Sequence, residues 1–280
     1  FDNPLYTEEM GMLDFLQNPD ITILQALLLK FKPVNMDVLP LYIVLLLWFP
    51  PMLWMLLRSP SFALIGSALI YALTWWFDWS IPAYPHGVWV FNPFAWQLLF
   101  VFGAWCALGG AQRLSRWVNS PVVIGLAAAY IVFAFCIAMT WYFPRLAVFV
   151  PHFVAEAIYP IDKTNLDVLR IVHFLSLAVI TVWFVPRNWP ALQSRIFWPA
   201  IVCGQHSLEI FCLGVFLAFA GHFVFTEVSN RLLMHVIVSV VGIATMVAVA
   251  AMVSWYKRVE RQGPGPRPPS IKPGYAGGGV

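Results

Sequence analysis

Three polar side chains lie close together inside a long apolar stretch, in the segment CGQHSLEIFCLG. Gln205 and His206 precede Glu209 by four and three residues, so in a helix these side chains share or border one face. We expect a membrane span over 197–224, which puts Glu209 roughly 18–23 Å from either end, near the middle of the bilayer. An ionisable group at that depth has to be paired, protonated or in contact with a wet cavity.

This arrangement allows two interpretations. His206 and Glu209 could relay a proton or activate a hydroxyl group, which is the work of a general acid–base pair. Alternatively, the same groups could hydrogen-bond across neighbouring helices and hold the bundle together. We predict no metal site with Cys203, because zinc needs three or four ligands with supporting contacts, and no partner cluster accompanies these residues.

A second polar group begins another apolar stretch, TNLDVLRIVHFL. Asp167, Arg170 and His173 follow one another at i, i+3 spacing, in the first two turns of a predicted span. Arg170 could extend back to the membrane surface with Asp167 as its partner, or Arg170 and His173 could form the floor of a pocket for a polar substrate. In FNPFAWQ, Asn92 is predicted to cap a helix, and Gln97 one turn later is a further pocket candidate.

The composition indicates a membrane protein. Of the 280 residues, 61% are hydrophobic and 10% are charged, whereas soluble domains carry about 25% charged residues. We therefore predict an all-α, polytopic bundle in contact with membrane lipids, and a net charge of +3 spread along the chain indicates no nucleic-acid surface. Two broken apolar segments, 10–33 and 146–160, are expected at the interface. Seven stretches are long enough to span a bilayer: 38–57, 61–79, 93–111, 121–142, 166–185, 197–224 and 232–255.

The basic residues predict the orientation. Ten of the sixteen Lys and Arg residues fall on the side that carries the C-terminus, which is therefore expected to be cytoplasmic. Residues 1–256 form the predicted membrane domain, and the Pro/Gly-rich segment 257–280 is expected to be a disordered tail. An odd number of spans places Phe1 outside, so we expect an odd number of further spans upstream.

Four ordered motifs, DVLPLYIVLLLWFPP, FNPFAWQLLFVFGAW, KTNLDVLRIVHFLSLA and GQHSLEIFCLG, make residues 1–255 similar to the OpgC family. The resemblance implies a bacterial inner-membrane O-acyltransferase that succinylates osmoregulated periplasmic glucans. It also implies ten spans, of which three would lie upstream of this chain. The donor would be a cytoplasmic acyl-CoA, with succinyl-CoA expected, and the acceptor a glucan hydroxyl outside; no bound cofactor is implied.

The resemblance also suggests roles for the polar groups. The histidine regarded as central to acyl transfer in such proteins belongs to the upstream spans, so His206 and Glu209 are expected to be helpers at the transfer step. Arg170 and His173 would hold the acceptor or the carboxylate of the donor. The remaining expected substrate-binding residues are Asp167, Gln97 and Gln205. A transporter or flippase of glycan or lipid intermediates, and a non-catalytic scaffold, remain alternatives, and the oligomeric state is open.

Overall fold

The computed structural model describes residues 12–31, 36–143, 145, 150–186, 189–229 and 231–261. Helices dominate the described parts of the chain, so the predicted all-α class is confirmed. The chain divides into two compact units, residues 1–187 and 188–280, which are described separately. The tail expected beyond 256 lies outside the described residues from 262 onward, although α12 runs through Arg261 and so includes the first residues assigned to that tail.

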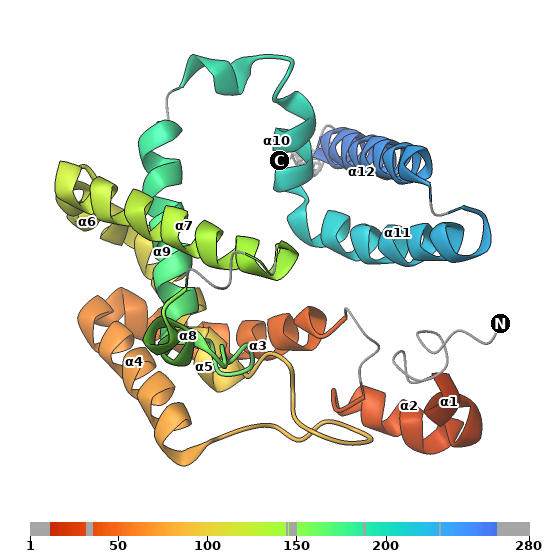
Figure 1. Cartoon of the computed structure of the whole chain (residues 1–280), viewed down its shortest axis with the longest axis horizontal. Coiled ribbons are helices and arrows are strands. Elements are labelled where there is room, and N and C mark those ends of the chain that lie inside the picture. The colour runs from red at the N-terminus through yellow and green to blue at the C-terminus, as the bar shows by residue number, and fades with distance from the viewer. Residues whose placement is uncertain are drawn as a thin grey trace, which may run out of the picture. The chain divides into compact units, whose positions relative to one another are not determined.

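In the first unit, three of the helices pack against one another: α3 (Val38–Arg58), α4 (Pro60–Phe77) and α5 (Pro93–Trp105) (Figure 1). Met52 and Leu56 of α3 meet Ala63 of α4 and Val101 of α5 in a buried apolar cluster. A kink separates α5 from α6 within Cys106–Gly110, where Leu108 leaves the helical region and Gly109 has φ 101°. The helices of this unit are α1 (Met12–Gln17), α2 (Pro19–Leu27), α3 (Val38–Arg58), α4 (Pro60–Phe77), α5 (Pro93–Trp105), α6 (Ala111–Val118), α7 (Pro121–Tyr142), α8 (His152–Ile158) and α9 (Val168–Phe184).

The α7 and α9 helices form the second packed layer of the first unit, and they cross in Figure 1. The loop that precedes α9 docks on the C-terminal end of α4 through two long-range hydrogen bonds. The Tyr71 hydroxyl donates to the Leu166 carbonyl at 2.9 Å, and the Trp75 indole donates to the Asn165 carbonyl at 3.1 Å. These bonds hold the loop before α9 against α4.

The second unit contains a short 3-10 turn at Pro190–Gln193 followed by α10 (Trp198–Gln205), α11 (Ser207–Glu227) and α12 (Leu232–Arg261). The α11 and α12 helices form a hairpin, and α10 packs on α12 (Figure 1). Val202 of α10, Ile210 of α11 and Ala250 of α12 form the buried cluster that holds the three together.

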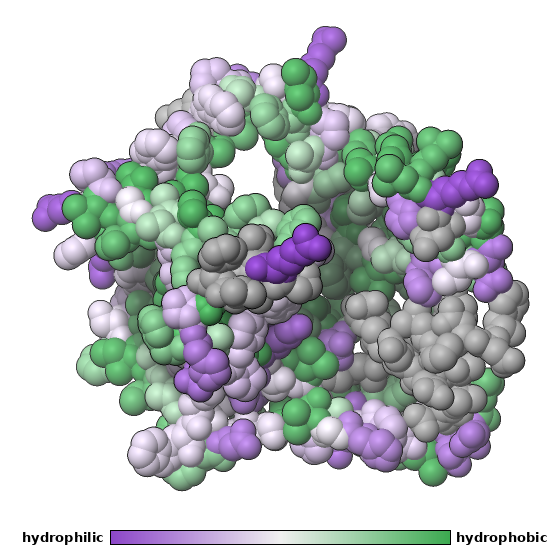
Figure 2. Space-filling model, in the orientation of Figure 1, coloured by the Kyte–Doolittle hydropathy of each residue, from purple (hydrophilic) through white to green (hydrophobic). Residues whose placement is uncertain are grey.

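Among the described residues, six helical segments are long and apolar enough to cross a bilayer: Val38–Arg58, Pro60–Phe77, Pro93–Val118, Pro121–Tyr142, Ser207–Glu227 and Leu232–Glu260. The span predicted over 166–185 is present as α9, but its 17 residues are at the lower limit of the length that crosses a bilayer. Large apolar side chains remain exposed on these helices, such as Leu232 at 81% on α12, where Figure 2 shows a hydrophobic surface. Such surface is stable in lipid, and the chain is a multi-pass membrane protein.

Candidate functional site

His206 lies at a break between two helices. It ends α10 and precedes α11 with φ −121° and ψ 40°, outside the helical region. The prediction of one continuous span over 197–224, with Glu209 near its middle, is therefore wrong. Glu209 is in the first turn of α11, which is 21 residues long and can span without α10. Hydropathy alone could not reveal the break, because apolar residues continue on both sides of it.

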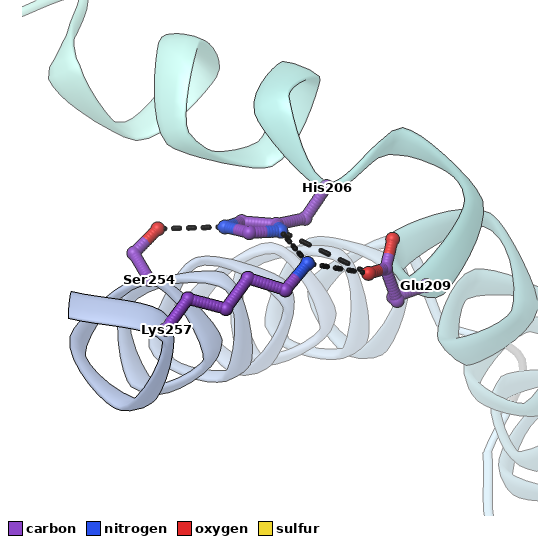
Figure 3. A network of polar contacts seen from close by, with 4 residues as sticks. All are labelled: His206, Glu209, Ser254 and Lys257. Carbon is purple, nitrogen blue, oxygen red and sulfur yellow. Dashed lines mark hydrogen bonds and ion pairs between the residues drawn. The ribbon is translucent and has the colours of Figure 1, made fainter. Parts of the chain in front are cut away.

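Four side chains converge at this break from α10–α11 and from α12 (Figure 3). The His206 Nε2 atom lies 2.7 Å from Ser254 Oγ, and Lys257 Nζ lies 3.3 Å from His206 Nδ1. Lys257 Nζ also donates to Glu209 Oε1 at 3.1 Å. The His206 side chain is buried, whereas Glu209 and Lys257 are about half exposed.

The His206–Glu209 couple predicted from the sequence is present at ion-pair distance, and Lys257 joins both of its members. His206 Nδ1 and Glu209 Oε1 are 3.9 Å apart, which is too long for a hydrogen bond, and the ammonium contacts both. An ammonium group only donates, so the Nδ1 of a neutral His206 accepts from Lys257 and its Nε2–H donates to Ser254. In this arrangement His206 can accept a proton at Nδ1 only after Lys257 moves.

A cavity of about 520 Å³, here called the α10–α12 pocket, adjoins this cluster. Gln205, which the sequence analysis predicted to bind substrate, and His206, which it predicted to help the transfer step, line this pocket together with Trp198. Lys257 and Arg258 add two cations from α12. Among its described lining residues none is acidic, so the pocket suits an anionic group.

The second predicted group starts α9 in the first unit. Asp167 is the N-cap of α9, since its Oδ1 accepts from the Leu169 amide at 2.8 Å. Capping the helix gives the Asp167 carboxylate a structural role. The pair between Asp167 and Arg170, which was one of the two sequence interpretations, is not formed. Within the part of the chain that the structure describes, the Arg170 guanidinium has no hydrogen-bond or ion-pair partner. His173 packs edge-on against Tyr130, with ring centroids 6.2 Å apart.

Arg170 and His173 line a cavity of about 700 Å³ between α7, α9 and the loop before α9. This α7–α9 pocket extends along α7 from Tyr130 to Trp141, a length of about 16 Å. Its walls are mainly aromatic and aliphatic, and Lys163 supplies a second cation. Arg170 and His173 therefore line a cavity, as the hypothesis that they form the floor of a pocket requires.

A buried amide network fixes the loop that carries this pocket. Asn92 is fully buried, and its amide donates to the Trp79 carbonyl and, at 2.8 Å, to Asn165 Oδ1. Its own Oδ1 accepts from the Phe94 amide, which confirms the predicted cap. Asp162 in turn accepts from the side chain of Asn165 at 2.9 Å. Each buried polar group has a partner, as burial requires.

Gln97 joins α5 to α4. Its side chain is buried, and Oε1 accepts from Ser67 Oγ at 2.6 Å while Nε2 donates to the carbonyls of Ser67 and Phe94. The amide is thus occupied by neighbouring helices, so binding a substrate through it would break contacts that already hold the bundle.

Sequence reasoning missed four residues of these sites. Lys257 contributed only to the orientation argument, and Ser254, Lys163 and Tyr130 were not singled out. The spacing of Ser254 and Lys257 at i, i+3 on the last turns of a span was the available signal, but it does not identify the helix they face. In the described parts of the chain, no group of three His, Cys, Asp or Glu side chains is placed to hold a metal ion.

Comparison with known proteins gives one family. The family model described as OpgC protein matches residues 1–258, which include all the helices of both units up to the last turn of α12. No curated protein and no solved structure matches the chain.

Proposed function

The chain belongs to the OpgC family, and from this premise we propose that it acts in a membrane O-acyltransferase. The reaction would move a succinyl group from an acyl-CoA donor in the cytoplasm to a hydroxyl of a periplasmic glucan. The family match over 1–258 is the observation that carries this proposal. The proposed location is a bacterial inner membrane with a cytoplasmic C-terminus, which the excess of Lys and Arg on that side supports.

We assign the α10–α12 pocket to the donor. Lys257 and Arg258 lie near the end of α12, which is cytoplasmic in the proposed orientation, and both line the pocket. A CoA donor carries phosphate groups, which basic side chains bind through charge-assisted hydrogen bonds. Gln205 and His206 line the same pocket and would contact the donor beside these phosphates.

His206 and Glu209 would help the transfer step indirectly, through Lys257. Glu209 holds the Lys257 ammonium at 3.1 Å, and the ammonium contacts His206 Nδ1. When a donor phosphate draws Lys257 away, Nδ1 becomes free to accept a proton, so donor binding would prepare the imidazole for acid–base work. In this role Glu209 and Lys257 are positioning residues.

The α7–α9 pocket would hold the other reacting group. Arg170 and His173 border it, and Asp167 determines the start of the helix that carries both of them. The Arg170 guanidinium is half-buried and has no carboxylate partner among the residues that the structure describes. Such a group is costly unless a ligand pairs with it, which supports a binding role.

Glucan succinylation in cells that produce the full-length protein tests both assignments. We expect Glu209→Gln and Arg170→Ala each to lower the label transferred from succinyl donor to glucan by about tenfold or more, as misplaced reacting groups do. Glu227→Gln is the matched control, because Glu227 is an exposed carboxylate at the opposite end of α11. Undiminished succinylation in Glu209→Gln and Arg170→Ala would refute the residue roles. A protein that moves glycan without forming a succinyl ester would be a transporter instead.

A further inference from the structure

Ser254 of α12 lies between an imidazole and a cavity. Its Oγ is 2.7 Å from His206 Nε2, within the range that joins a nucleophile to its general base. Ser254 also lines the α10–α12 pocket, whose volume is about 520 Å³. A serine in this position can react with a ligand in the cavity, because the hydroxyl and a group that could take its proton are both at the pocket wall.

Glu209 supplies a carboxylate on the other side of the same ring. Its Oε1 is 3.9 Å from His206 Nδ1, so the imidazole lies between the hydroxyl and the carboxylate (Figure 3). In a serine–histidine–carboxylate triad, the carboxylate holds the tautomer with a proton on Nδ1, and Nε2 takes the proton of the serine. Such triads occur on unrelated folds and are recognised by geometry, so the order of these residues in the chain is no obstacle.

Lys257 prevents that tautomer in the structure. Its ammonium lies 3.3 Å from His206 Nδ1 and 3.1 Å from Glu209 Oε1, so Nε2 carries the ring proton and Ser254 only accepts. Lys257 is about half exposed and lines the pocket beside Arg258, so an anion bound there can draw the ammonium away. The ring can then carry its proton on Nδ1, facing Glu209, and Nε2 can accept from Ser254.

We propose that Ser254 is the nucleophile of the α10–α12 pocket, and that Lys257 permits its reaction only when an activated acyl compound with an anionic leaving portion is bound. Ser254 Oγ attacks the carbonyl carbon of a thioester, the carbon–sulfur bond breaks, and an ester forms on the serine. The Oγ proton passes to His206 Nε2 and then to the sulfur, which leaves as a thiol. The inference rests on the proposed acyl transfer and deepens it, because the transfer then passes through a seryl ester.

An uncharged fluorophosphonate tests the nucleophile without the acyl donor, because it reacts with activated serine hydroxyls whatever their natural substrate. The full-length protein is labelled in detergent micelles, and the labelled residue is identified by peptide mass spectrometry. We expect label on Ser254, at a rate that pyrophosphate raises by about tenfold or more, since the resting tautomer blocks the base. Lys257→Met should label at the raised rate without pyrophosphate and should not respond to it. His206→Gln should slow labelling by about a hundredfold or more, because the general base is lost.

Ser239→Ala is the matched control, because Ser239 is an exposed serine of the same helix outside the pocket lining. It should label at the rate of the unsubstituted protein. The nucleophile is overturned if Ser254 takes no label either in the unsubstituted protein with pyrophosphate or in Lys257→Met. The role of Lys257 is overturned if Lys257→Met labels no faster than the unsubstituted protein without pyrophosphate.

Glucan succinylation separates this inference from the proposed function. With succinyl-CoA, the unsubstituted protein should carry a succinyl ester on Ser254, and Ser254→Ala should lose both the ester and the transfer to glucan. Undiminished succinylation in Ser254→Ala would overturn the inference and leave the proposed function intact. Label on Ser254 in a protein that forms no succinylated glucan would support the nucleophile and overturn the proposed function.

Discussion

Ser67 and Gln97 join α4 to α5, and replacing them should destabilise the protein to different extents. Both side chains are buried, with exposed fractions of 0% and 4%. Ser67→Ala removes the donor at 2.6 Å and leaves Gln97 Oε1 buried without it. An orphaned acceptor costs about 1–3 kcal/mol, and coupling energies between membrane helices average about 0.6 kcal/mol with a maximum near 1.7. We therefore expect a loss of about 1 kcal/mol.

Gln97→Met should cost less, about 0.5 kcal/mol or below. The Ser67 hydroxyl can then donate to the carbonyl one turn earlier in its own helix, and the thioether fills a volume close to that of the amide. The double variant Ser67→Ala/Gln97→Met should resemble Gln97→Met alone, because no buried acceptor is left unpaired. Removing both partners of a buried hydrogen bond is milder than removing one.

The assay is unfolding of the full-length protein in mixed micelles titrated with dodecyl sulfate and followed by far-ultraviolet circular dichroism. Additive losses from Ser67→Ala and Gln97→Met, or a larger loss from Gln97→Met, would refute this account of the contact. Glucan succinylation adds a second readout. Gln97→Met should keep activity within about twofold, and loss of activity at unchanged stability would instead make Gln97 a substrate-binding residue, as its sequence position suggested.

Three further substitutions test how the first unit is held together, by the same titration. Asn92→Ala should lower the free energy of unfolding by about 2 kcal/mol, because it removes a helix cap and leaves the buried Asn165 oxygen without its donor. A loss below about 0.5 kcal/mol would contradict the role of this hydrogen-bond network. Gly110→Ala would make Cβ overlap the Trp105 ring and should cost about 1–3 kcal/mol. Gly103→Ala meets nothing within 4 Å and should be neutral or stabilising, and equal effects of the two substitutions would contradict this packing.

The apolar stretches were predictable because hydropathy is a property of consecutive residues. Five of the predicted spans correspond to long helical segments, and the local signal of Asn92 before Pro93 identified a helix cap that the structure has. The docking of the loop before α9 was not predictable, because it depends on hydrogen bonds from Tyr71 and Trp75, which are about ninety residues away in the chain.

The candidate sites show where local reasoning fails. His206 with Glu209, and Arg170 with His173, are two sets of polar side chains that the sequence shows within apolar stretches. The first set adjoins the α10–α12 pocket and the second lines the α7–α9 pocket. His206 and Glu209 lie at ion-pair distance, as their spacing allowed, but the sequence did not indicate that Lys257 contacts both side chains. A helical spacing identifies residues on one face but says nothing about the side chain that a second helix brings to that face.

By itself, the sequence determined that this chain is a set of apolar helices, which end where capping residues, prolines and charges interrupt them. Only the tertiary structure decided that α10 and α11 separate at His206, that Lys257 contacts both the imidazole and the carboxylate, and that Arg170 has no partner among the described residues. The physical reason is the range of the forces. Burial in lipid acts on each segment independently, whereas polar groups in a membrane satisfy their hydrogen bonds with whichever helix packing brings close.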